Sequence, residues 1–422
     1  MVPYSRTATI VSLLLALVNA KDCTLEPLGD GFDDTDQVLD AIAQCGNGGT
    51  TTFGEGLYNI TRKMTWELQD AKVDLHGFLS FVPDVEYWLD AENTYRVVFI
   101  QSQASWFVVT GQDFEIDAHG TGGIQGNGQP WWDYFRVHQK ADGDGRPISL
   151  TLHQATNGTV KDFQIQSPPF WCNTVAESND IQYDGMTCHA VNENPEWYGQ
   201  NAVPNTDGIC FYRSDDVRLN NWNITIGDDC LAFKGNSSNI VAHNISCHGG
   251  NGIAFGSLGQ YYNLTDNISH VRLEDIKVIQ YPNLTIQPNM ANGIYFKSWT
   301  DTVNGEPPTG GGGGGGLVTD IEMRNVVVEG VNTPIHLYQT NEGHSGDTPS
   351  ELKFGNMSFI NWSGQSNGST LVNLDCSPAV GCGEFYFENF QVQAPNETEG
   401  EYRCNNVIGV EGLPEECVVS DD

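Results

Sequence analysis

The chain has 422 residues, and 54 Asp and Glu against 19 Lys and Arg give it a formal net charge of −35 at pH 7. Such acidity argues against nucleic acid or an anionic membrane as partner, because both bind cationic surfaces. A chain of this length usually forms two or three domains unless it is a repeat protein, so internal repetition would indicate a single domain.

Residues 1–20 have the features of a signal peptide. Arg6 precedes an apolar run over 8–18, and Val18-Asn19-Ala20 fits the small-residue rule for cleavage. The apolar run is about half the roughly 20 residues needed to span a bilayer. We therefore predict a secreted protein whose residues 21–422 form one domain.

The next element is a predicted helix of about ten residues, since Asp33-Asp34-Thr35-Asp36 resembles an N-cap and is followed by apolar positions at helical spacing. Those apolar residues are Val38, Leu39, Ile42 and Cys45. An amphipathic helix here could cover the end of whatever structure follows it.

From residue 181 onward, apolar residues recur at relative positions 0, +2, +5 and +7. The repeats begin at Ile181, Val217, Ile240, Val271, Ile321 and Leu352. Position +4 is commonly Asn or Asp, as at Asn221, Asn244, Asp275, Asn325 and Asn356. The offset of two is a strand period, and its change of parity indicates a bend between short strands.

The repeats begin 23 to 50 residues apart and are rich in Gly and β-branched residues. They predict an all-β fold, a parallel β-helix in which each coil adds one rung. The helix over 33–45 would cap its first coil, because a solenoid needs its exposed end covered. The uninterrupted glycine run 310–316 has no side chains to pack and is predicted to be a flexible surface loop between coils.

The 11 cysteines follow no zinc-ligand spacing, so disulfides are expected in an oxidising compartment. The preferred pairs are Cys23 with Cys45, Cys230 with Cys247, Cys376 with Cys382, and Cys404 with Cys417. Cys172, Cys188 and Cys210 remain, so at least one thiol is left over. Predicted N-glycosylation sites are Asn59, Asn157, Asn223, Asn236, Asn244, Asn263, Asn267, Asn283, Asn356, Asn361, Asn367 and Asn396.

The repeat also locates a cluster of carboxylates. Asp228 lies 11 residues after Val217, and Asn251 lies 11 after Ile240, so the two should be stacked neighbours on consecutive coils. Asp207 and Asp229 lie 10 and 11 residues before those same repeat starts. Asp207, Asp228 and Asp229 should therefore converge on one face. Their mutual repulsion would raise the pKa of one of them, as glycoside hydrolysis requires.

Several segments, in this order, resemble the motifs of the polygalacturonase family of glycoside hydrolases. They are Asn205-Thr206-Asp207-Gly208, Gly227-Asp228-Asp229-Cys230, Gly250-Asn251-Gly252-Ile253-Ala254-Phe255-Gly256-Ser257 and Asn292-Gly293-Ile294-Tyr295-Phe296-Lys297. Upstream, Gly126-Asn127-Gly128-Gln129-Pro130-Trp131-Trp132-Asp133 is similar to a further family segment. The resemblance covers nearly the whole chain after residue 20.

The resemblance implies a right-handed parallel β-helix and hydrolysis of pectic α-glycosidic bonds with inversion. It implies Asp228 as general acid, with Asp207 and Asp229 holding and activating the water. Lys297 would bind the sugar carboxylate, with Lys234 and Arg213 as auxiliaries. We expect a monomer that needs neither a metal nor a cofactor.

Three positions depart from the family pattern. Asn251 stands where the family usually has His, Tyr295 where it has Arg, and Asn341 where it has Tyr. Asn251 and Tyr295 are therefore expected in an altered shell of substrate-binding residues around Lys297.

Phe233-Lys234-Gly235-Asn236-Ser237-Ser238 and the segment 252–260 resemble the exo-acting branch, which removes terminal galacturonate as a galacturan 1,4-α-galacturonidase. The long segments 189–204 and 302–316 could then close one end of the substrate cleft. A rhamnogalacturonan-acting exo-hydrolase or α-L-rhamnosidase is the alternative, favoured by Asn251 and Tyr295. A carbohydrate-binding protein with a decayed site is the non-enzymatic alternative, and release of reducing sugar would distinguish it.

Overall fold

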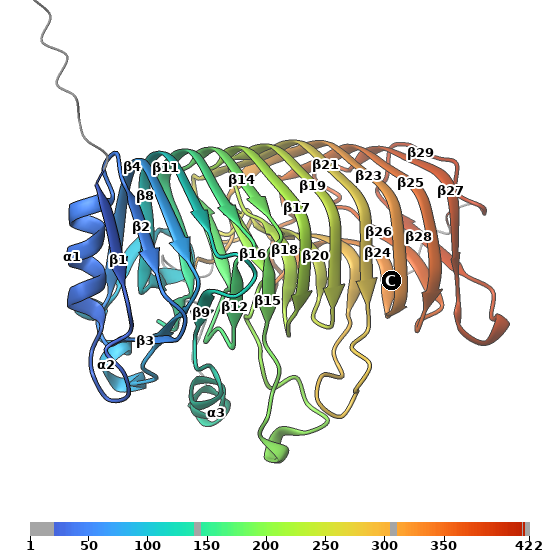
Figure 1. Ribbon diagram of the computed structural model, residues 1–422. Helices are drawn as coiled ribbons and strands as arrows, with labels where there is room; N and C mark the ends of the chain where they lie inside the picture. The colour runs from blue at the N-terminus through green and yellow to red at the C-terminus, as the bar shows by residue number, and fades with distance from the viewer. Residues whose placement is uncertain (1–20, 139–144, 304–309, 416, 418–422) are drawn as a thin grey trace, which may run out of the picture.

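The structure, a computed structural model, describes residues 21–138, 145–303, 310–415 and 417. It confirms the predicted right-handed parallel β-helix: one sheet of 26 strands, paired in parallel from coil to coil, forms the solenoid (Figure 1). The predicted signal peptide, residues 1–20, lies outside the described residues.

Strands of the solenoid fall into three groups, two of which follow one another along the chain. The early coils contain β1 (Asp22–Leu25), β2 (Thr50–Phe53), β3 (Leu57–Ile60), β4 (Met64–Leu75), β5 (Phe78–Phe81), β8 (Phe107–Asp117), β9 (Gly123–Gln125), β11 (Leu150–Lys161), β12 (Gln164–Gln166) and β15 (Thr187–His189). Long strands that bend across two faces follow, namely β17 (Asp215–Thr225), β19 (Ser237–His248), β21 (Thr265–Ile279), β23 (Gly315–Val331), β25 (Lys353–Ser366) and β27 (Gly383–Gln393). The shorter strands β14 (Asn179–Asp184) and β29 (Val410–Glu411) pair with β17 and β27.

One further face of the solenoid is a column of shorter strands, called here the site sheet. It consists of β13 (Asn173–Ala176), β16 (Ile209–Tyr212), β18 (Asp229–Phe233), β20 (Gly252–Leu258), β22 (Asn292–Trp299), β24 (Thr333–Asn341), β26 (Thr370–Asp375) and β28 (Glu401–Asn405). Its register aligns Phe211, Phe233, Phe255 and Phe296 on four successive strands, and all four are fully buried. Their rings stack with centroids 4.4 to 4.9 Å apart. Successive side chains of a strand point to opposite sides of the sheet. Because each phenylalanine points into the core, its neighbours along the same strand point outward.

The predicted bend between short strands is confirmed by the backbone. Asn221, Asn244, Asp275 and Asn325 at position +4 all have φ between 56 and 59°, the left-handed region that Asn and Asp tolerate best. The side chains also join successive coils, since Asn244 Nδ2 donates to Asn221 Oδ1 at 2.7 Å.

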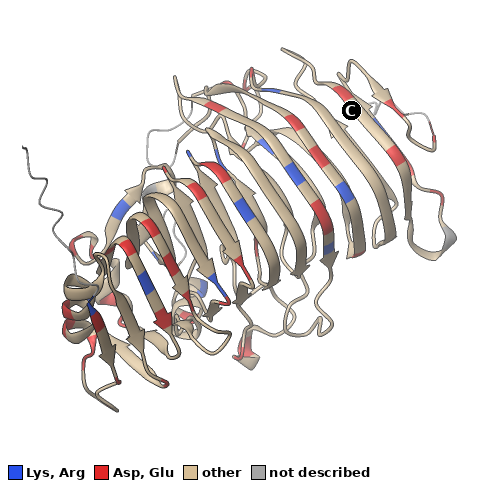
Figure 2. Cartoon of the chain, turned by 45° about the horizontal axis from the view of Figure 1, so that its top comes forward, with Lys and Arg blue, Asp and Glu red and all other residues tan. Residues whose placement is uncertain are grey.

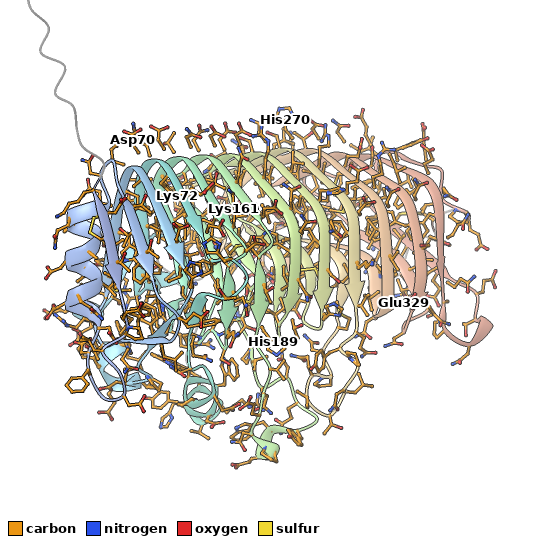
Figure 3. The ribbon with its side chains drawn as sticks, in the orientation of Figure 1. Asp70, Lys72, Lys161, His189, His270 and Glu329 are labelled. Carbon is orange, nitrogen blue, oxygen red and sulfur yellow. A yellow bond between two sulfur atoms is a disulfide. The ribbon has the colours of Figure 1, made fainter. Side chains whose placement is uncertain are left out.

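A second left-handed position precedes each repeat start and was not predicted. It is occupied by Asp180, Asp216, Asn239, His270, Asp320 and Asn356, with φ between 50 and 57°, and on an early coil by Asp70, with φ of 47°. Figure 3 shows Asp70 and His270 along the same edge of the solenoid.

The register predicted for the last repeat is wrong. Ile321 pairs with Met357 and not with Leu352, so Asn361 takes position +4 and Asn356 precedes the repeat start. The two left-handed positions lie five residues apart, and the apolar pattern also repeats after five residues. A shift of five therefore leaves the sequence pattern nearly unchanged.

Helices cap and flank the solenoid. The predicted capping helix is confirmed as α1 (Thr35–Cys45), which buries Val38, Ala41 and Ile42 in the core at the end of the first coil (Figure 1). The Asp34 carboxylate makes no cap hydrogen bond within α1. It accepts instead from the backbone of Leu28 and Asn59, each at 2.8 Å, and so ties the helix entry to β3. The other helices are α2 (Val85–Leu89) and α3 (Gln129–Val137).

The glycine run was predicted to be a flexible loop, and this is wrong. Within 310–314 all but Gly313 are buried, and the backbone N–H groups of Gly311 and Gly312 donate to the Gln260 carbonyl. A Cβ added at Gly312 would lie 2.3 Å from the Thr300 carbonyl oxygen. Glycine is thus needed here for close backbone packing, and Gly315 and Gly316 already belong to β23.

Disulfides join neighbouring segments of the solenoid. The four predicted pairs are confirmed, and Cys172 bonds to Cys188 as a fifth. Cys210 is buried with a free thiol.

Basic and acidic residues occur on neighbouring strands of the solenoid (Figure 2). Glu115, for example, contacts both Lys72 and Lys161 on the adjacent coils. Within the described ranges, no helix combines the length and the apolar character needed to cross a membrane.

Candidate active site

The predicted site residues lie on the outer face of the site sheet and in the turns that precede its strands. Cys210, Ala232, Ala254 and Tyr295 occupy one outward column of successive strands. Two residues further along, Lys234, Gly256 and Lys297 form a second column, since Lys234 Nζ donates to the Gly256 carbonyl at 2.8 Å and a Cβ added at Gly256 would lie 2.4 Å from Lys297 Cγ. Lys297 in turn pairs with Tyr338 of β24.

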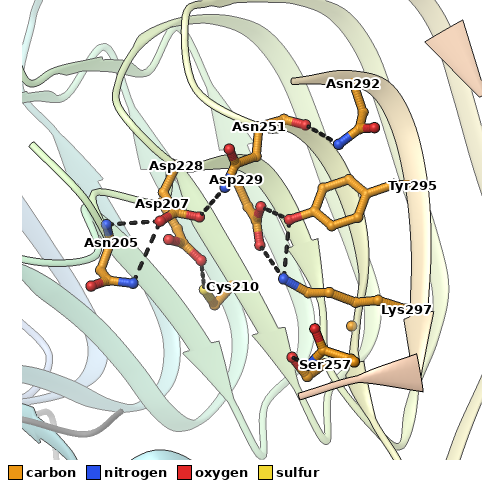
Figure 4. A network of polar contacts seen from close by, with 12 residues as sticks. Asn205, Asp207, Cys210, Asp228, Asp229, Asn251, Ser257, Asn292, Tyr295 and Lys297 are labelled. Atoms are coloured by element: carbon orange, nitrogen blue, oxygen red, sulfur yellow. Dashed lines mark hydrogen bonds and ion pairs between the residues drawn. The ribbon is translucent and has the colours of Figure 1, made fainter. Parts of the chain in front are cut away.

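The three aspartates converge as the repeat predicted (Figure 4). Gly208 N–H donates to the Asp229 carbonyl at 2.9 Å, so the Asp207 and Asp229 turns are neighbours on adjacent coils. Asp207 and Asp229 are only 3% and 2% exposed, whereas Asp228 is partly exposed. Among the three, Asp228 is therefore the one that a substrate can reach most directly.

Asp228 is held by amide donors on both of its oxygens. Asn205 donates to Oδ2 through its backbone N–H at 2.9 Å and through Nδ2 at 3.4 Å. Asn251 donates to Oδ1 through Nδ2 at 2.8 Å, which confirms the predicted stacking of Asn251 on Asp228. Asn289 Nδ2 donates in turn to Asn251 Oδ1 at 2.8 Å and fixes the orientation of that amide.

Asp229 is bound by the two motif residues of β22. The Tyr295 hydroxyl donates to Asp229 Oδ1, and Lys297 Nζ lies 3.1 Å from that hydroxyl and 3.8 Å from Asp229 Oδ2. Tyr295 is only 3% exposed. Its hydroxyl is therefore directed at the carboxylate cluster, while the partly exposed Lys297 can still meet a ligand.

The electrostatics favour retention of one proton by the cluster. Burial raises the pKa of Asp207 well above its ordinary value, and the charges of Asp228 and Asp229 add to this effect. Burial and the charge of Asp229 raise the pKa of Asp228 to about 6. Burial lowers the pKa of the Lys297 ammonium, but the charge of Asp229 outweighs it and the pKa rises overall. Two ammonium groups, Lys234 and Lys297, balance the cluster when one of the three carboxyls is protonated.

The auxiliary cations differ in their placement. Lys234 is 4% exposed, donates to the Gly256 carbonyl at 2.8 Å, and lies 5.3 Å from the centre of the Trp171 ring. Arg213 instead pairs with Glu177 at 3.4 Å and lies over the Tyr212 ring. Of the two, Lys234 shares the outward column of Lys297, and Arg213 does not.

Sequence reasoning assigned no role to several side chains that complete the site. Cys210 Sγ donates to Asp207 Oδ2 at 3.3 Å. Tyr338 lies beside Lys297, its hydroxyl 3.5 Å from Asn341 Oδ1. The repeat register could have identified Tyr338, because it continues the outward column of Lys297 by one coil.

The segment 189–204 forms a projecting loop beside α3 (Figure 1). Its short helix, Pro195–Trp197, is held there because Trp197 Nε1 and Asn194 Nδ2 both donate to Asp133. Residues 304–309 of the other predicted wall segment lie outside the described residues. Within the described parts of the chain, no group of three or more His, Cys, Asp or Glu side chains could hold a metal ion.

Comparison with known proteins agrees with this geometry. The chain is 36% identical to an Aspergillus niger protein that carries the name galacturan 1,4-α-galacturonidase A, with 94% of this chain and 93% of that protein covered. It is 30% identical to an α-L-rhamnosidase of Aspergillus niger, with 93% and 89% covered. Endo-xylogalacturonan hydrolase from Aspergillus tubingensis has the same fold, with a TM-score of 0.78 at 22% identity over 95% of this chain and 99% of that one.

The sequence profile of one family matches residues 62–414, which include every site residue described above. The parallel β-helix and the three converging aspartates agree with this match, and the chain belongs to the glycosyl hydrolases family 28.

Proposed function

We propose that this glycosidase is a secreted, inverting exo-hydrolase that removes terminal galacturonate from pectic polysaccharides and oligosaccharides. The observation that carries the proposal is the Asp228 carboxyl, partly exposed, with a pKa raised to about 6, in front of the buried Asp207 and Asp229. A carboxyl with a raised pKa, beside further carboxyl groups of the same cluster, is the arrangement that glycoside hydrolysis requires.

In the proposed reaction, Asp228 gives its proton to the glycosidic oxygen as the bond from that oxygen to the anomeric carbon breaks. Asp207 and Asp229 hold a water on the opposite side of the sugar, and one of them accepts a proton as the water oxygen bonds to the anomeric carbon. The water displaces the leaving group directly, so an α-linked substrate gives a β-configured product. The amides of Asn205 and Asn251 stabilise the Asp228 carboxylate that the first transfer leaves behind.

Exo action is supported by an apolar cover on the site sheet. A small sheet of β6 (Tyr95–Val98), β7 (Gln103–Ser105) and β10 (Pro147–Ile148) lies outside the solenoid. Val98 and Ile148 of this sheet form one buried cluster with Phe170, Trp171 and the outward column Cys210, Ala232, Ala254 and Tyr295.

The β6–β7 hairpin also reaches the loop after β20. The Gln101 backbone N–H donates to the Tyr261 hydroxyl at 2.6 Å, and Gln101 Nε2 donates to Gln260 Oε1 at 3.3 Å. The hairpin is thus held over this face by Val98 and by Gln101. In that position it would stop a polysaccharide from continuing past the carboxylates. Only a terminal sugar could then enter, and this hairpin, rather than the segment 189–204, is the wall that we propose.

Galacturonate as the terminal sugar is supported by Lys297, whose ammonium is a suitable partner for a sugar carboxylate, and by the galacturonidase name of the relative. The alternative is a neutral sugar such as rhamnose. This alternative is favoured by the Tyr295 hydroxyl, which contacts both Asp229 and Lys297 and so links the ammonium to that carboxylate. It is also favoured by the similarity to an α-L-rhamnosidase.

Secretion is supported by the signal-like residues 1–20, by five disulfides, and by the sequons, all of which except Asn59 have an exposed asparagine.

Product analysis on polygalacturonate, rhamnogalacturonan and xylogalacturonan tests the proposal. Galacturonate alone, released from polygalacturonate from the earliest time points, is the expected result. Rhamnose from rhamnogalacturonan would support the alternative, and no released sugar from any of the three would contradict both.

A further inference from the structure

Arg146 is a buried cation that lies outside the group of residues discussed so far. It is 4% exposed, and its guanidinium lies 4.8 Å from the centres of both the Phe135 ring of α3 and the Phe170 ring that precedes β13. Burial of an arginine is costly unless its donors find acceptors, so its hydrogen-bond partners indicate what it is for.

Two acceptors of Arg146 belong to the turn that leads into Asp207. Nη2 donates to Asn205 Oδ1 at 2.7 Å, and Nη1 donates to the Pro204 carbonyl at 3.1 Å. Asn205 itself has φ of 59°, a left-handed conformation that surrounding contacts must hold in place. Arg146 therefore fixes both the backbone of this turn and the side chain of Asn205.

The contact determines which way the Asn205 amide points. A guanidinium can only donate, so the carbonyl oxygen Oδ1 has to face Arg146 and the amino group Nδ2 has to face the other way. In that orientation Nδ2 and the backbone N–H of Asn205 are both directed at Asp228 Oδ2. A rotation of the amide by half a turn would instead bring two oxygens together, one of them charged.

The two sides of Asp228 are thus supported differently. On the Oδ1 side the chain of donors runs from Asn289 through Asn251 and consists of neutral amides. On the Oδ2 side it runs from Arg146 through Asn205 and begins at a positive charge. A cation bonded to the amide oxygen polarises the amide and strengthens the donation from its nitrogen.

We propose that Arg146 is a positioning residue for Asp228, acting through Asn205: it holds the Asn205 amide and backbone N–H against Oδ2 of the Asp228 carboxylate that forms when the proton leaves. The inference rests on the proposed role of Asp228 as general acid. Loss of Arg146 should slow proton donation without changing the surface that binds the sugar.

A double-mutant cycle on kcat tests this coupling directly. Arg146→Met should lower kcat by about 10- to 100-fold, the range for loss of a charge-assisted hydrogen bond, and leave KM within about two-fold. In an Asn205→Ala background the same substitution should cost clearly less, because the side-chain amide is gone and Arg146 can act only through the backbone N–H of residue 205. Arg146→Lys, which keeps a cationic donor, should recover part of the activity in the wild-type background only.

The pH profile gives a second readout that a merely structural defect would not change. Weaker donation to the Asp228 carboxylate favours its protonated form, so the basic limb of the kcat profile should move to higher pH in Arg146→Met. Arg136→Met serves as the matched control, because Arg136 of α3 also lies over an aromatic ring, Trp197, but donates to Gln200 and Asn201.

Equal losses from Arg146→Met in both backgrounds, or a rise in KM with kcat unchanged, would overturn the proposal. Should Arg146→Met fail to fold, as judged by thermal unfolding, the cycle with Arg146→Lys decides in the same way. Asp228→Asn distinguishes a failure of the proposed function from a failure of the role given to Arg146. If it retains turnover, the proposed function fails, whereas if it is inactive while Arg146 and Asn205 act independently, only the role of Arg146 fails.

Discussion

Asn251 donates its side-chain amide to Oδ1 of Asp228 at 2.8 Å, in the place where the family usually has a histidine. An amide has no charge to gain or lose in the working range of pH. In this chain the titration that controls proton donation should therefore belong to the carboxylates alone.

This arrangement predicts the pH dependence of kcat/KM. Burial and the charge of Asp229 raise the pKa of Asp228 to about 6, and a general acid must be protonated to act, so kcat/KM should fall as pH rises through about 6. Asn251→Ala removes a donor that stabilises the carboxylate form, and its basic limb should lie at higher pH than that of the wild type. Initial rates at substrate concentrations well below KM would measure both, and a flat profile between pH 5 and 8 would contradict the assignment.

Asp228→Asn should reduce kcat by at least about 10²-fold, as expected for loss of a general acid. Asp216→Asn is a suitable control, since Asp216 lies on the outside of the solenoid and pairs with Arg218 at 2.7 Å. Near-normal turnover of Asp228→Asn would remove Asp228 from the mechanism.

The same variant should be more stable than the wild type at neutral pH. The folded pKa of Asp228 is raised from 3.8 to about 6, so its contribution to stability is fully present below the unfolded value and is lost as pH rises through the folded value. An uncharged Asn avoids that loss, by up to about 3 kcal/mol at pH 7.5. Thermal unfolding should show this gain at pH 7.5 and not at pH 3.5, and equal shifts at both pH values would argue against a buried carboxylate here.

The convergence of Asp207, Asp228 and Asp229 could be predicted from sequence because a solenoid repeats its coordinates. Residues at the same offset from consecutive repeat starts must stack, whatever the loops between them do. The same regularity produced the error at Leu352, since two left-handed positions five residues apart, exemplified by Asn356 and Asn361, look alike in sequence.

The residues that reach the site from outside the repeat could not be predicted in this way. Arg146 and Gln101 lie in connections that leave the solenoid and return over its outer face, and no periodicity fixes their position relative to β18 or β20. The glycine run was misinterpreted for a related reason. Absence of side chains permits both flexibility and close packing, and only the neighbouring Gln260 and Thr300 carbonyls distinguish the two.

The stereochemistry of the product tests the direct displacement. Hydrolysis of an α-linked oligosaccharide should give the β-anomer first, because water attacks from the side opposite the leaving oxygen. Proton NMR recorded before mutarotation would identify the first product. Initial appearance of the α-anomer would indicate a covalent intermediate and would assign one of the aspartates a different role.

Lys297→Met should raise KM for galacturonate oligomers by about 10- to 100-fold, because a charge-assisted hydrogen bond to the sugar carboxylate is lost. Lys277→Met, at an exposed position of β21, should leave KM unchanged and serves as the control. Unchanged galacturonate hydrolysis by Lys297→Met would indicate that Lys297 contacts only Asp229 and Tyr295 and does not bind the sugar. It would favour a neutral terminal sugar.

The anchored hairpin is expected to limit the enzyme to exo action. Tyr261 accepts the Gln101 N–H at 2.6 Å, and its ring lies 5.9 Å from that of Phe99, so Tyr261→Ala should release the tip of the hairpin from the loop after β20. The carboxylates and Lys297 should stay in place, because they are held by Asn205, Asn251 and Tyr295 (Figure 4).

With the cover loosened, a polysaccharide could extend past the site, and cleavage within the chain should begin. We expect the wild type to release only monosaccharide from polygalacturonate with slow loss of viscosity. Tyr261→Ala should add a ladder of oligomers at early times and a faster fall in viscosity. Tyr262→Ala is the matched control, since its neighbouring side chain is exposed and should not hold the hairpin. If Tyr261→Ala still yields monosaccharide alone, another segment closes the site. If the wild type already produces the ladder, the hairpin does not close it at all.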